Sequence, residues 1–448
     1  MAFGTGTAPA SRRTVFAAAF VGTSIESYDY YIFGTASALV FETIFFPRFD
    51  ATAGTLAAFA TFAVGFLARP IGAAVVGHFG DRVGRTPTLI VTLLLIGGST
   101  FLIGVLPTYA AVGVAAPLLL VVLRVLQGFG ASGEWGGAIL IATESAGPGR
   151  RALYGSFAQF GVPVGVLTSN LAFLAVSGMS DDSFEAYGWR IPFLISIGLV
   201  VFGLVMRRRL SESPEFERMR RENRIVKLPV NELVGRDRRN LVLGALAAMA
   251  PPALGYTVIV YMLTYGTQQV GFERSTLLTL ILSSTVIWIG AIYASARVSD
   301  RVGAKKVYLA GALSAVIWPI PMFALVNTGR VAMALPAFVV AAIVQGVMAG
   351  AQGGLFTEMF DVRVRYSGIS IAYSAGGVIG GAVTPLVAAA LFKIYETSTA
   401  VALYISALSL ISLVAVSGVQ KAGEAARWPW DPVVHRLRLT LLPSGRKP

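Results

Sequence analysis

Two carboxylic acids interrupt the first long apolar stretch of the chain, in the sequence TSIESYDYYIFGT from Thr23 to Thr35. Glu26 and Asp29 lie three residues apart and Tyr30 lies four residues after Glu26, so all three share one face of a helix. At about 1.5 Å per residue from Thr14, the two acids lie roughly 18–22 Å along that helix. Burial favours the neutral form of a carboxyl group and a nearby guanidinium favours the charged form, so an acid whose arginine partner changes can carry a proton.

Three more ionisable side chains lie within apolar stretches of the N-terminal half, whereas those of the C-terminal half contain none: Arg69, Arg124 and Glu134. Arg124, Gln127 and Glu134 share one side of a helix, beside glycines that allow close helix packing. Charges at membrane depth are costly, so they face water or one another. Arg69 is suited to bidentate binding of a substrate carboxylate. The alternative for each is a structural ion pair, such as Arg69 with Glu26.

The composition places these groups in a membrane. The chain has 448 residues, of which 55% are hydrophobic and 13% charged, and its mean hydropathy is +0.71. Soluble domains have about a quarter charged residues. The absence of cysteine and the presence of only two histidines exclude a disulfide scaffold, a thiol nucleophile and a His or Cys metal centre. We expect no metal site and no cofactor, and no nucleophile–base constellation or phosphate loop indicates an enzyme.

The charge-free stretches predict twelve membrane-spanning helices, since about 20 apolar residues cross the hydrocarbon core. The sequence around Leu106–Tyr109 divides one long stretch into two helices. The predicted segments are 14–40, 53–78, 87–106, 111–143, 152–176, 188–208, 239–268, 275–297, 306–327, 331–358, 366–392 and 399–420.

The distribution of basic residues predicts the orientation. With both termini cytoplasmic, 29 of the 36 Lys and Arg residues lie on the inner side, as the positive-inside rule requires. The net charge of +13 is therefore explained by topology and does not indicate nucleic acid binding. No cleavage site of the A-x-A kind indicates a signal peptide. We expect a multi-pass protein of the cell membrane.

A similar polar loop motif occurs once in each half of the chain. Gly77–Arg85 (GHFGDRVGR) follows the second helix and Arg297–Lys306 (RVSDRVGAKK) follows the eighth. Duplicated halves are typical of secondary transporters whose site lies at mid-membrane. The predicted fold is an all-α polytopic membrane protein with two pseudo-symmetric six-helix halves. Its expected parts are an N-terminal bundle (1–208), a cytoplasmic linker (209–238), a C-terminal bundle (239–420) and a basic tail (421–448) that lies on the membrane surface through Trp428 and Trp430.

These motifs together resemble a known family. The G-x-x-x-D-R-x-G-R loop at Gly77–Arg85 resembles the signature of the major facilitator superfamily. The finer motifs resemble its metabolite:proton symporter family; they are IESYDYYIFGTASALVF, FLARPIG (Phe66–Gly72), RVLQGFGASGEWGGA (Arg124–Ala138), YGWRIPF (Tyr187–Phe193) and VRYSGIS (Val364–Ser370). The sequence departs from that pattern at Ser27 and Ala304, and it lacks the heptad tail of osmosensing relatives.

The resemblance implies proton-driven uptake of a small carboxylate-bearing metabolite, either an organic acid or a zwitterion such as proline or betaine, by alternating access. Members of this family couple protons through an acid in the first helix and an arginine in the fourth, which here are Asp29 and Arg124. Glu26 and Glu134 remain competing proton carriers. The expected partners are the substrate, the proton as coupling ion and the lipid bilayer.

Two further sets of residues complete the expected site. The predicted substrate contacts are Arg69, Tyr30, Gln127, Gln159, Tyr256, Tyr261, Tyr265, Gln268, Gln345, Gln352 and Tyr373. The resemblance implies an inner gate formed by Asp81, Arg82, Arg85, Glu144, Arg151, Asp300, Arg301, Glu358 and Arg365. An antiporter or efflux pump of the same fold and a non-transporting membrane sensor are the alternative functions. The exact substrate and the oligomeric state remain open.

Overall fold

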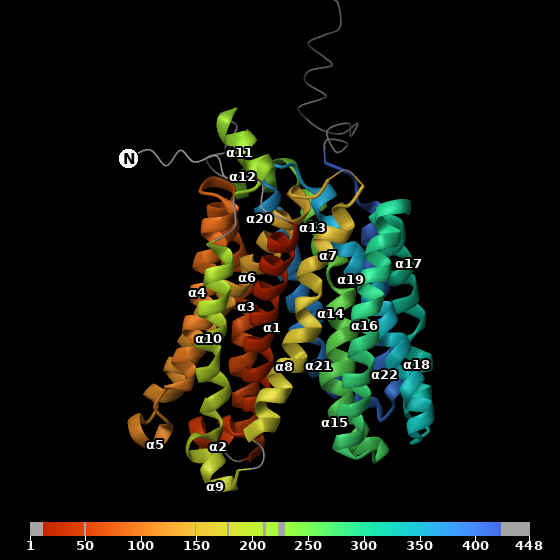
Figure 1. Cartoon of the computed structure of the whole chain (residues 1–448). Coiled ribbons are helices and arrows are strands. Elements are labelled where there is room, and N and C mark those ends of the chain that lie inside the picture. The colour runs from red at the N-terminus through yellow and green to blue at the C-terminus, as the bar shows by residue number, and fades with distance from the viewer. Residues whose placement is uncertain are drawn as a thin grey trace, which may run out of the picture.

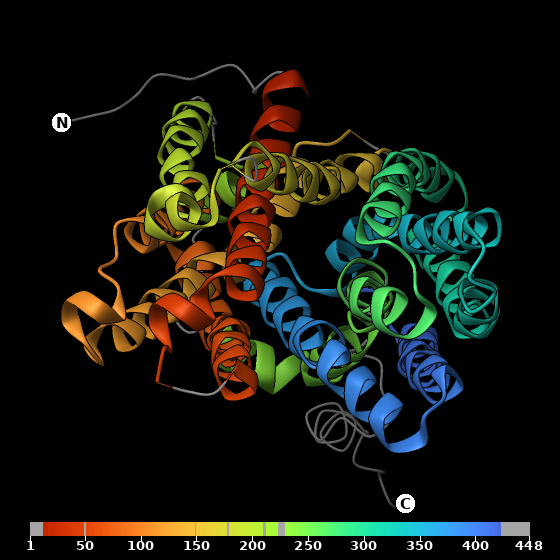
Figure 2. The same ribbon diagram turned by 90° about the horizontal axis from the view of Figure 1, so that it is seen from below.

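The computed structural model describes residues 12–48, 51–147, 149–176, 179–208, 212–222 and 229–422. In these ranges the secondary structure is helical throughout, without strands (Figure 1). The predicted surface tail lies outside the described residues, which end at 422. The helices form two groups that stand side by side when viewed along their axes (Figure 2).

The first half contains α1–α10. Its helices are α1 (Arg12–Leu39), α2 (Phe41–Phe45), α3 (Ala51–Arg82), α4 (Arg85–Gly104), α5 (Tyr109–Val112), α6 (Ala115–Glu144), α7 (Arg151–Gln159), α8 (Gly161–Val176), α9 (Asp181–Ser183), the π-helix η1 (Phe184–Gly188) and α10 (Arg190–Arg207). Two short helices, α11 (Pro214–Arg221) and α12 (Pro229–Arg236), lie in the range predicted as the linker.

The second half contains α13–α22. Its helices are α13 (Arg238–Ala247), α14 (Ala250–Tyr256), η2 (Thr257–Tyr261), α15 (Met262–Tyr265), η3 (Gly266–Val270), α16 (Arg274–Val302), α17 (Ala304–Ile317), α18 (Pro319–Val326), α19 (Val331–Met359), α20 (Arg365–Gly377), η4 (Val378–Ala382), α21 (Thr384–Tyr395) and α22 (Ser398–Gly418).

Each predicted membrane segment coincides with one helix or one run of helices. Within the described ranges, nine of these are long and apolar enough to cross a membrane, or ten if the bent pair α17 and α18 is one span. The other two segments are less regular. Helix α1 carries the acids Glu26 and Asp29, and the fifth segment is divided at Phe160 into α7 and α8.

Prolines and glycines explain several helix ends. Helix α18 begins at Pro319, at a bend of 45° after α17, because proline removes a backbone donor and disturbs the preceding turn. Gly84 and Gly303 end the second helix of each half with φ angles of 132° and 99°. Only glycine adopts such angles without strain. The repeated loop motif therefore produces the same turn in both halves.

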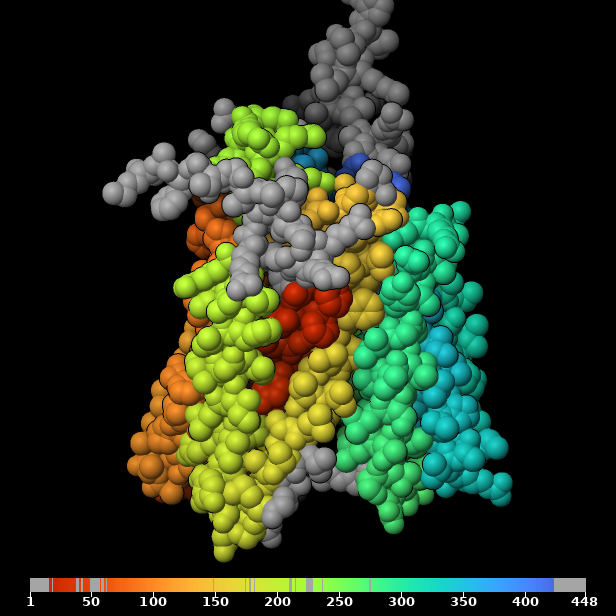
Figure 3. All heavy atoms as spheres, viewed as in Figure 1, coloured from red at the N-terminus to blue at the C-terminus, as the bar shows by residue number. Residues whose placement is uncertain are grey.

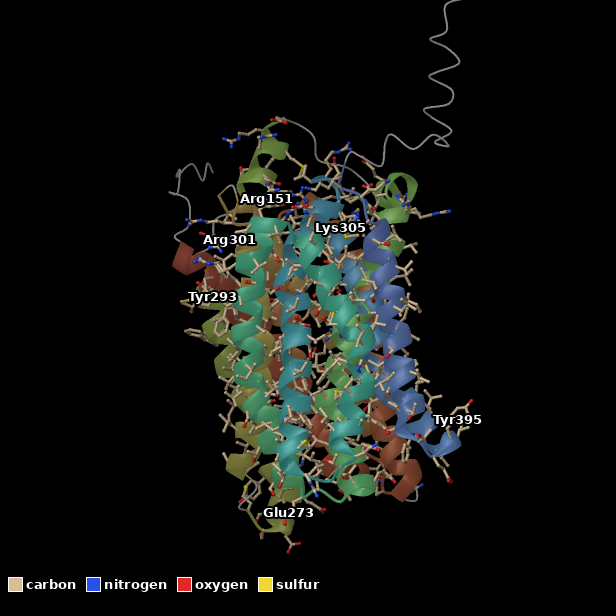
Figure 4. The ribbon with its side chains drawn as sticks, turned by 90° about the vertical axis from the view of Figure 1, so that its right-hand side faces the viewer. Arg151, Glu273, Tyr293, Arg301, Lys305 and Tyr395 are labelled. Carbon is tan, nitrogen blue, oxygen red and sulfur yellow. The ribbon has the colours of Figure 1, made fainter. Side chains whose placement is uncertain are left out.

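Basic side chains collect at one end of the bundle, which we call the basic face. In Figure 4, Arg151, Arg301 and Lys305 lie at this end and Glu273 lies at the opposite end. The linker helices α11 and α12 also lie there (Figure 1). In Figure 3, α8 and α16 separate towards the end away from the basic face. The two halves therefore meet most closely at the basic face.

Candidate functional site

A cavity of about 260 Å³, part of it open to solvent, lies among α1, α3, α4 and α6 of the first half. We call it the charged cavity. Its lining combines two acids, two arginines, a tyrosine and an amide with small and apolar residues: Glu26, Asp29, Tyr30, Gly65, Arg69, Ile96, Arg124, Gln127, Gly128 and Ala131. Four of the five charged residues that the sequence places at membrane depth thus meet there, and all except Glu134 are included. Tyr30 and Gln127, which share helix faces with these charges, line the same cavity.

Glycines bring the helices of the charged cavity close together. A Cβ atom added at Gly65 would lie 2.9 Å from Nη2 of Arg124, and one added at Gly128 would lie 3.1 Å from Cβ of Ala68. Close approach of this kind is the usual role of small residues between membrane helices. The glycines therefore set the distance between the arginine-bearing helices α3 and α6.

Arg69 pairs with Glu26 inside the charged cavity. Its Nη2 atom lies 3.4 Å from Oε1 of Glu26, and the two side chains are 14% and 10% exposed. The guanidinium also lies 4.8 Å from the ring centre of Phe66 and 5.3 Å from that of Tyr30. Arg69 is thus held by a carboxylate and two aromatic rings while part of it faces the cavity, which suits a group that exchanges Glu26 for a substrate carboxylate.

Asp29 is the most buried acid that lines the charged cavity, with 1% exposure. Within the described part of the chain, neither of its carboxylate oxygens accepts a hydrogen bond. The Thr100 hydroxyl lies beside it, but it donates its single proton to the Ile96 carbonyl at 2.9 Å. Asp29 thus differs from Glu26 in having electrostatic neighbours without a hydrogen-bonded partner.

Arg124 is the charged neighbour of Asp29 on α6. Its Nη1 atom donates to the Gln127 side chain, and its guanidinium lies 3.8 Å from the ring centre of Phe33. Gln127 in turn donates to Thr100 at 2.7 Å. Arg124, Gln127 and Thr100 form a buried chain of polar groups that ends at Asp29.

Glu134 is paired with an arginine at the end of the last helix of the first half. Arg207, at the end of α10, is 1% exposed and donates to both Glu134 and the Leu89 carbonyl. Thr92 donates to the other oxygen of Glu134 at 3.3 Å. Arg207 belongs to the same basic run as Arg208, so no sequence signal separates the buried arginine from its exposed neighbour.

The second half contributes rings and amides to the space between the halves. The Tyr256 and Tyr30 rings are 6.0 Å apart, and the Tyr373 ring stacks on Trp135 at 3.7 Å. Gln159 donates to Gln352 at 2.9 Å across the half-interface. Tyr256, Tyr373 and Gln352 therefore contact the first half, and the amides of Gln159 and Gln352 bind each other.

The other predicted contacts of the second half lie away from the charged cavity. Tyr261 and Tyr265 stack on each other at 5.7 Å, and Tyr265 donates to Asn327 at 2.7 Å. Gln268 is exposed in η3. Gln345 lines a separate cavity within the second half. Amphipathic spacing cannot distinguish these positions from those at the interface, because every helix of a half has both an inner and an outer face.

Asp81 connects the two halves at the basic face. Its carboxylate accepts hydrogen bonds from Tyr366 N at 3.2 Å, Ser367 N at 2.9 Å and Ser367 Oγ at 2.8 Å. These groups lie in the first turn of α20, where a negative charge is stabilised. Its arginine partner is Arg85 of the same half, at 3.1 Å. Asp81 therefore fastens α3 to the second half.

Further contacts surround this junction. In the second half, Asp300 accepts from Ala152 N at 2.8 Å and Leu153 N at 3.2 Å, which repeats the role of Asp81 in the opposite direction. Arg365 lies 3.5 Å from Glu144 across the interface, and Arg85 lies 3.9 Å from the same glutamate. The junction is thus built from both copies of the loop motif.

The linker adds an acid that the sequence analysis did not select. Glu215 on α11 binds Arg151 of the first half at 2.8 Å and Arg365 of the second half at 2.6 Å. Ser213 caps α11 by accepting from Phe216 N at 3.1 Å. Serine at the N-cap followed by proline at the first helical position is a common helix start, so the sequence carries a helix signal here but no sign of the bridging role of Glu215.

Three predicted gate residues lie at the edge of the junction. Arg82 is exposed and contacts His78 at 3.2 Å, and Arg301 is exposed. Glu358 binds Lys421 at 3.1 Å, so its partner lies after α22 and not in the first half.

Two loop carboxylates near the junction have shifted pKa values. Burial raises the pKa of Glu212 above its ordinary value, even though Ser213 N and Thr86 N donate to it. Burial alone would also raise the pKa of Asp361, but hydrogen bonds from the backbone and side chain of Arg363 lower it below the ordinary value. Asp361, between α19 and α20, is therefore stabilised in its charged form. Glu212, between α10 and α11, is protonated more readily than an ordinary glutamate.

Two helical halves joined at one face, with charged groups in the core of one half, define a polytopic protein of the membrane-transporter class. The chain belongs to the Major Facilitator Superfamily, whose family model matches residues 19–385. It is a metabolite transporter of that superfamily and not an enzyme.

Two curated relatives and one solved structure are similar over most of the chain. The inner membrane metabolite transport protein YhjE of Escherichia coli (strain K12) is 40% identical over 414 residues, which cover 91% of this chain and 93% of the relative. The shikimate transporter of the same organism is 38% identical, with 91% and 94% covered. The solved structure of the MFS proton:xylose symporter XylE bound to 6-bromo-6-deoxy-D-glucose has a TM-score of 0.75 at 17% identity, with 92% and 96% covered. The last likeness supports the fold alone.

Proposed function

We propose that the chain is a proton-coupled symporter that takes up a small carboxylate-bearing metabolite. Asp29 is the proton carrier, and Arg69 binds the substrate carboxylate. The two halves rock about the charged cavity, and the junction at the basic face holds one end closed. The relatives named for metabolite transport and for shikimate support this substrate class.

The observation that carries the proposal is the difference between Asp29 and the other two acids. Glu26 pairs with Arg69 and Glu134 pairs with Arg207, whereas Asp29 accepts no hydrogen bond within the described residues. A buried carboxylate without hydrogen bonds is costly in its charged form. Of the three candidates, Asp29 is the acid for which protonation relieves the largest cost, and Glu26 and Glu134 serve as structural ion pairs.

Arg124 is the group that transmits the protonation of Asp29. A charged Asp29 attracts Arg124 and opposes its movement, whereas a neutral Asp29 does not. Arg124 is also bound to Gln127 on its own helix, so its release from Asp29 changes the polar chain that reaches Thr100 on α4. We infer that proton binding makes the arrangement of α1, α4 and α6 easier to change.

Arg69 is the proposed anchor because it is the arginine of the cavity with the larger exposed fraction, 14% of its side chain. Arg124 is 2% exposed. A substrate carboxylate can displace Glu26 from the guanidinium, because both carboxylates offer the same pair of acceptor oxygens. Substrate binding is thereby linked to the charge state of α1, on which Glu26 and Asp29 share one face.

The proposed setting is the inner membrane with the basic face towards the cytoplasm. The basic face carries Arg82, Arg85, Arg151, Arg301 and Lys305, and the positive-inside rule assigns such a face to the cytoplasm. Both termini would then be cytoplasmic, because α1 begins and α22 ends at that face (Figure 1).

Uptake by the purified chain in proteoliposomes tests this function. Labelled organic acids and zwitterions, including shikimate and glycine betaine, are offered with and without an inward proton gradient. We expect at least one carboxylate to accumulate only when the gradient is present, and a protonophore to abolish the accumulation. Accumulation that ignores the gradient would exclude symport, and accumulation driven by an outward gradient would indicate an antiporter.

A further inference from the structure

A second cavity, of about 270 Å³ and part of it open, lies within the second half. We call it the neutral cavity. Its lining comes from η2, α16 and α19 and consists of apolar, hydroxyl, indole and amide side chains: Val258, Ile259, Ile281, Ser284, Thr285, Trp288, Ala342 and Gln345. No ionisable side chain is among them, which is the opposite of the charged cavity.

The indole of Trp288 is an unsatisfied donor in this lining. Trp288 is 6% exposed, and its Nε1 atom has no hydrogen-bond partner in the described part of the chain. It lies at the midpoint of the 29-residue helix α16. A buried N–H group without a partner is costly, so a ligand acceptor at this point would recover that cost.

Gln345 supplies a carboxamide to the same cavity. It lies at the midpoint of α19, which also has 29 residues, so it shares the depth of Trp288. A Cβ atom added at Gly255 would clash with the amide of Gln345. The glycine thus leaves the space that this amide occupies, and the amide offers both a donor and an acceptor.

The hydroxyl groups of the lining offer acceptors only. Ser284 donates its proton to the Ile281 carbonyl at 2.8 Å, and Thr285 donates to the same carbonyl at 2.8 Å. The oxygen lone pairs of both residues remain available to a donor. The neutral cavity therefore offers donors and acceptors without charge, which suits a hydroxyl group, since a hydroxyl both donates and accepts.

Other tryptophans with unsatisfied indole groups lack such a cavity. Trp189 is enclosed by Phe41, Phe45 and Phe193, and Trp135 stacks on Tyr373. Trp288 differs because it lines a cavity together with the hydroxyl groups of its own helix and the amide of Gln345 on α19.

The neutral cavity adjoins the space between the halves. Trp288 belongs to a small buried cluster against which Phe160, Val162 and Ile259 pack, and the first two of these belong to the first half. Tyr256, whose ring is 6.0 Å from that of Tyr30 in the charged cavity, precedes Ile259 by three residues, or about one helical turn of roughly 5 Å. The neutral cavity thus lies within about one helical turn of the tyrosine whose ring meets the charged cavity.

We propose that the neutral cavity is a second substrate subsite, in which Trp288 and Gln345 bind hydroxyl groups on the body of the carboxylate held by the first half. The inference rests on the proposed function, and it narrows the substrate class to hydroxylated carboxylates. A zwitterion without hydroxyl groups would leave the indole N–H unpaired and would bind less well.

A matched pair of ligands tests the subsite. Shikimate and 1-cyclohexenecarboxylate share a ring and a carboxylate but differ in three hydroxyl groups. We expect the wild-type chain in proteoliposomes to bind shikimate at least tenfold more tightly, measured by competition with uptake and by the change in tryptophan emission. Trp288→Phe and Gln345→Leu should each reduce this ratio to less than threefold without changing the affinity for 1-cyclohexenecarboxylate.

Trp189→Phe is the matched control, because it also removes a buried indole but from a site without a cavity. It should leave the ratio unchanged. Equal binding of the two ligands by the wild type, or an unchanged ratio in both cavity variants, would overturn the subsite. If the gradient drives uptake only of carboxylates that have no hydroxyl groups, the subsite is overturned but the proposed function stands. If the gradient drives uptake of no carboxylate at all, the proposed function itself is contradicted.

Discussion

The two halves share one architecture but differ in the chemistry of their cores. The cavity of the first half is lined by two acids and two arginines, whereas the cavity of the second half is lined by an indole, an amide and hydroxyl groups. Both halves nevertheless contribute a carboxylate that accepts backbone hydrogen bonds from the other at the basic face. The difference teaches that the duplicated motif preserves the junction, while the charged cavity is found in one half and the neutral cavity in the other.

The largest effect should come from breaking an ion pair of the first half. Arg207→Ala leaves Glu134 buried without its partner, and such a loss costs about 3–5 kcal/mol. We expect little folded protein in detergent, measured by size-exclusion chromatography and thermal unfolding. The double variant Arg207→Met with Glu134→Leu should restore stability, since it removes both charges. A stable Arg207→Ala variant would contradict a structural role for this pair.

A smaller effect should follow from removing the proposed anchor. Arg69→Gln should raise the apparent Kd for a carboxylate substrate by roughly 10-fold to 100-fold, because hydrogen bonds to charged groups contribute about 1.5–3 kcal/mol. Glu26→Gln is the control, since it leaves Arg69 in place and should weaken binding less. If Arg69→Gln binds normally and Arg124→Gln does not, the anchor is Arg124.

The shared junction is tested at a contact between the backbones of the two halves. A Cβ atom at Gly353 would lie 2.8 Å from the backbone of Gly155, and overpacking of this kind costs about 1–3 kcal/mol. We expect Gly353→Ala to open the basic face. The chain has no cysteine, so Ser156→Cys, which is fully buried beside this contact, reports the opening by faster thiol labelling.

Gly198→Ala is the control for that experiment, because an added Cβ there would meet nothing within 4 Å. Labelling should be unchanged in this variant. Equal labelling of the Gly353 and Gly198 variants would show that the Gly155 contact does not hold the junction.

The smallest effect is expected for a tyrosine of the second half outside both cavities. Tyr265→Phe removes the hydrogen bond to Asn327, which costs about 0.5–1.5 kcal/mol of stability. It should leave substrate affinity and gradient-driven uptake unchanged. A selective loss of affinity would place Tyr265 in the substrate path and extend the site beyond the two cavities.

The sequence predicted the helices and the first-half cavity better than the contacts of the second half. Long charge-free stretches determine where a chain crosses a membrane, so all twelve predicted segments coincide with helices. Rare intramembrane charges likewise select Glu26, Asp29, Arg69 and Arg124, which meet in one cavity.

Neutral polar residues carry no comparable signal. Trp288 was not selected, and Tyr261 lies in a packed cluster although its residue type matches that of Tyr256. The partner of an ion pair is also hidden in sequence, since Arg207 and Glu134 are 73 residues apart. Pairing depends on tertiary packing, which places an arginine against Glu26 and another against Glu134.

The most direct test of the account is the behaviour of Asp29→Asn in proteoliposomes, compared with Glu26→Gln and the wild type. Gradient-driven accumulation and substrate exchange without a gradient are measured on the same preparation, because exchange needs the binding site and the rocking motion but no net proton transfer. We predict that Asp29→Asn keeps exchange and loses accumulation, while Glu26→Gln keeps gradient-driven accumulation. Accumulation by Asp29→Asn at the wild-type level would contradict the assignment of the proton to Asp29.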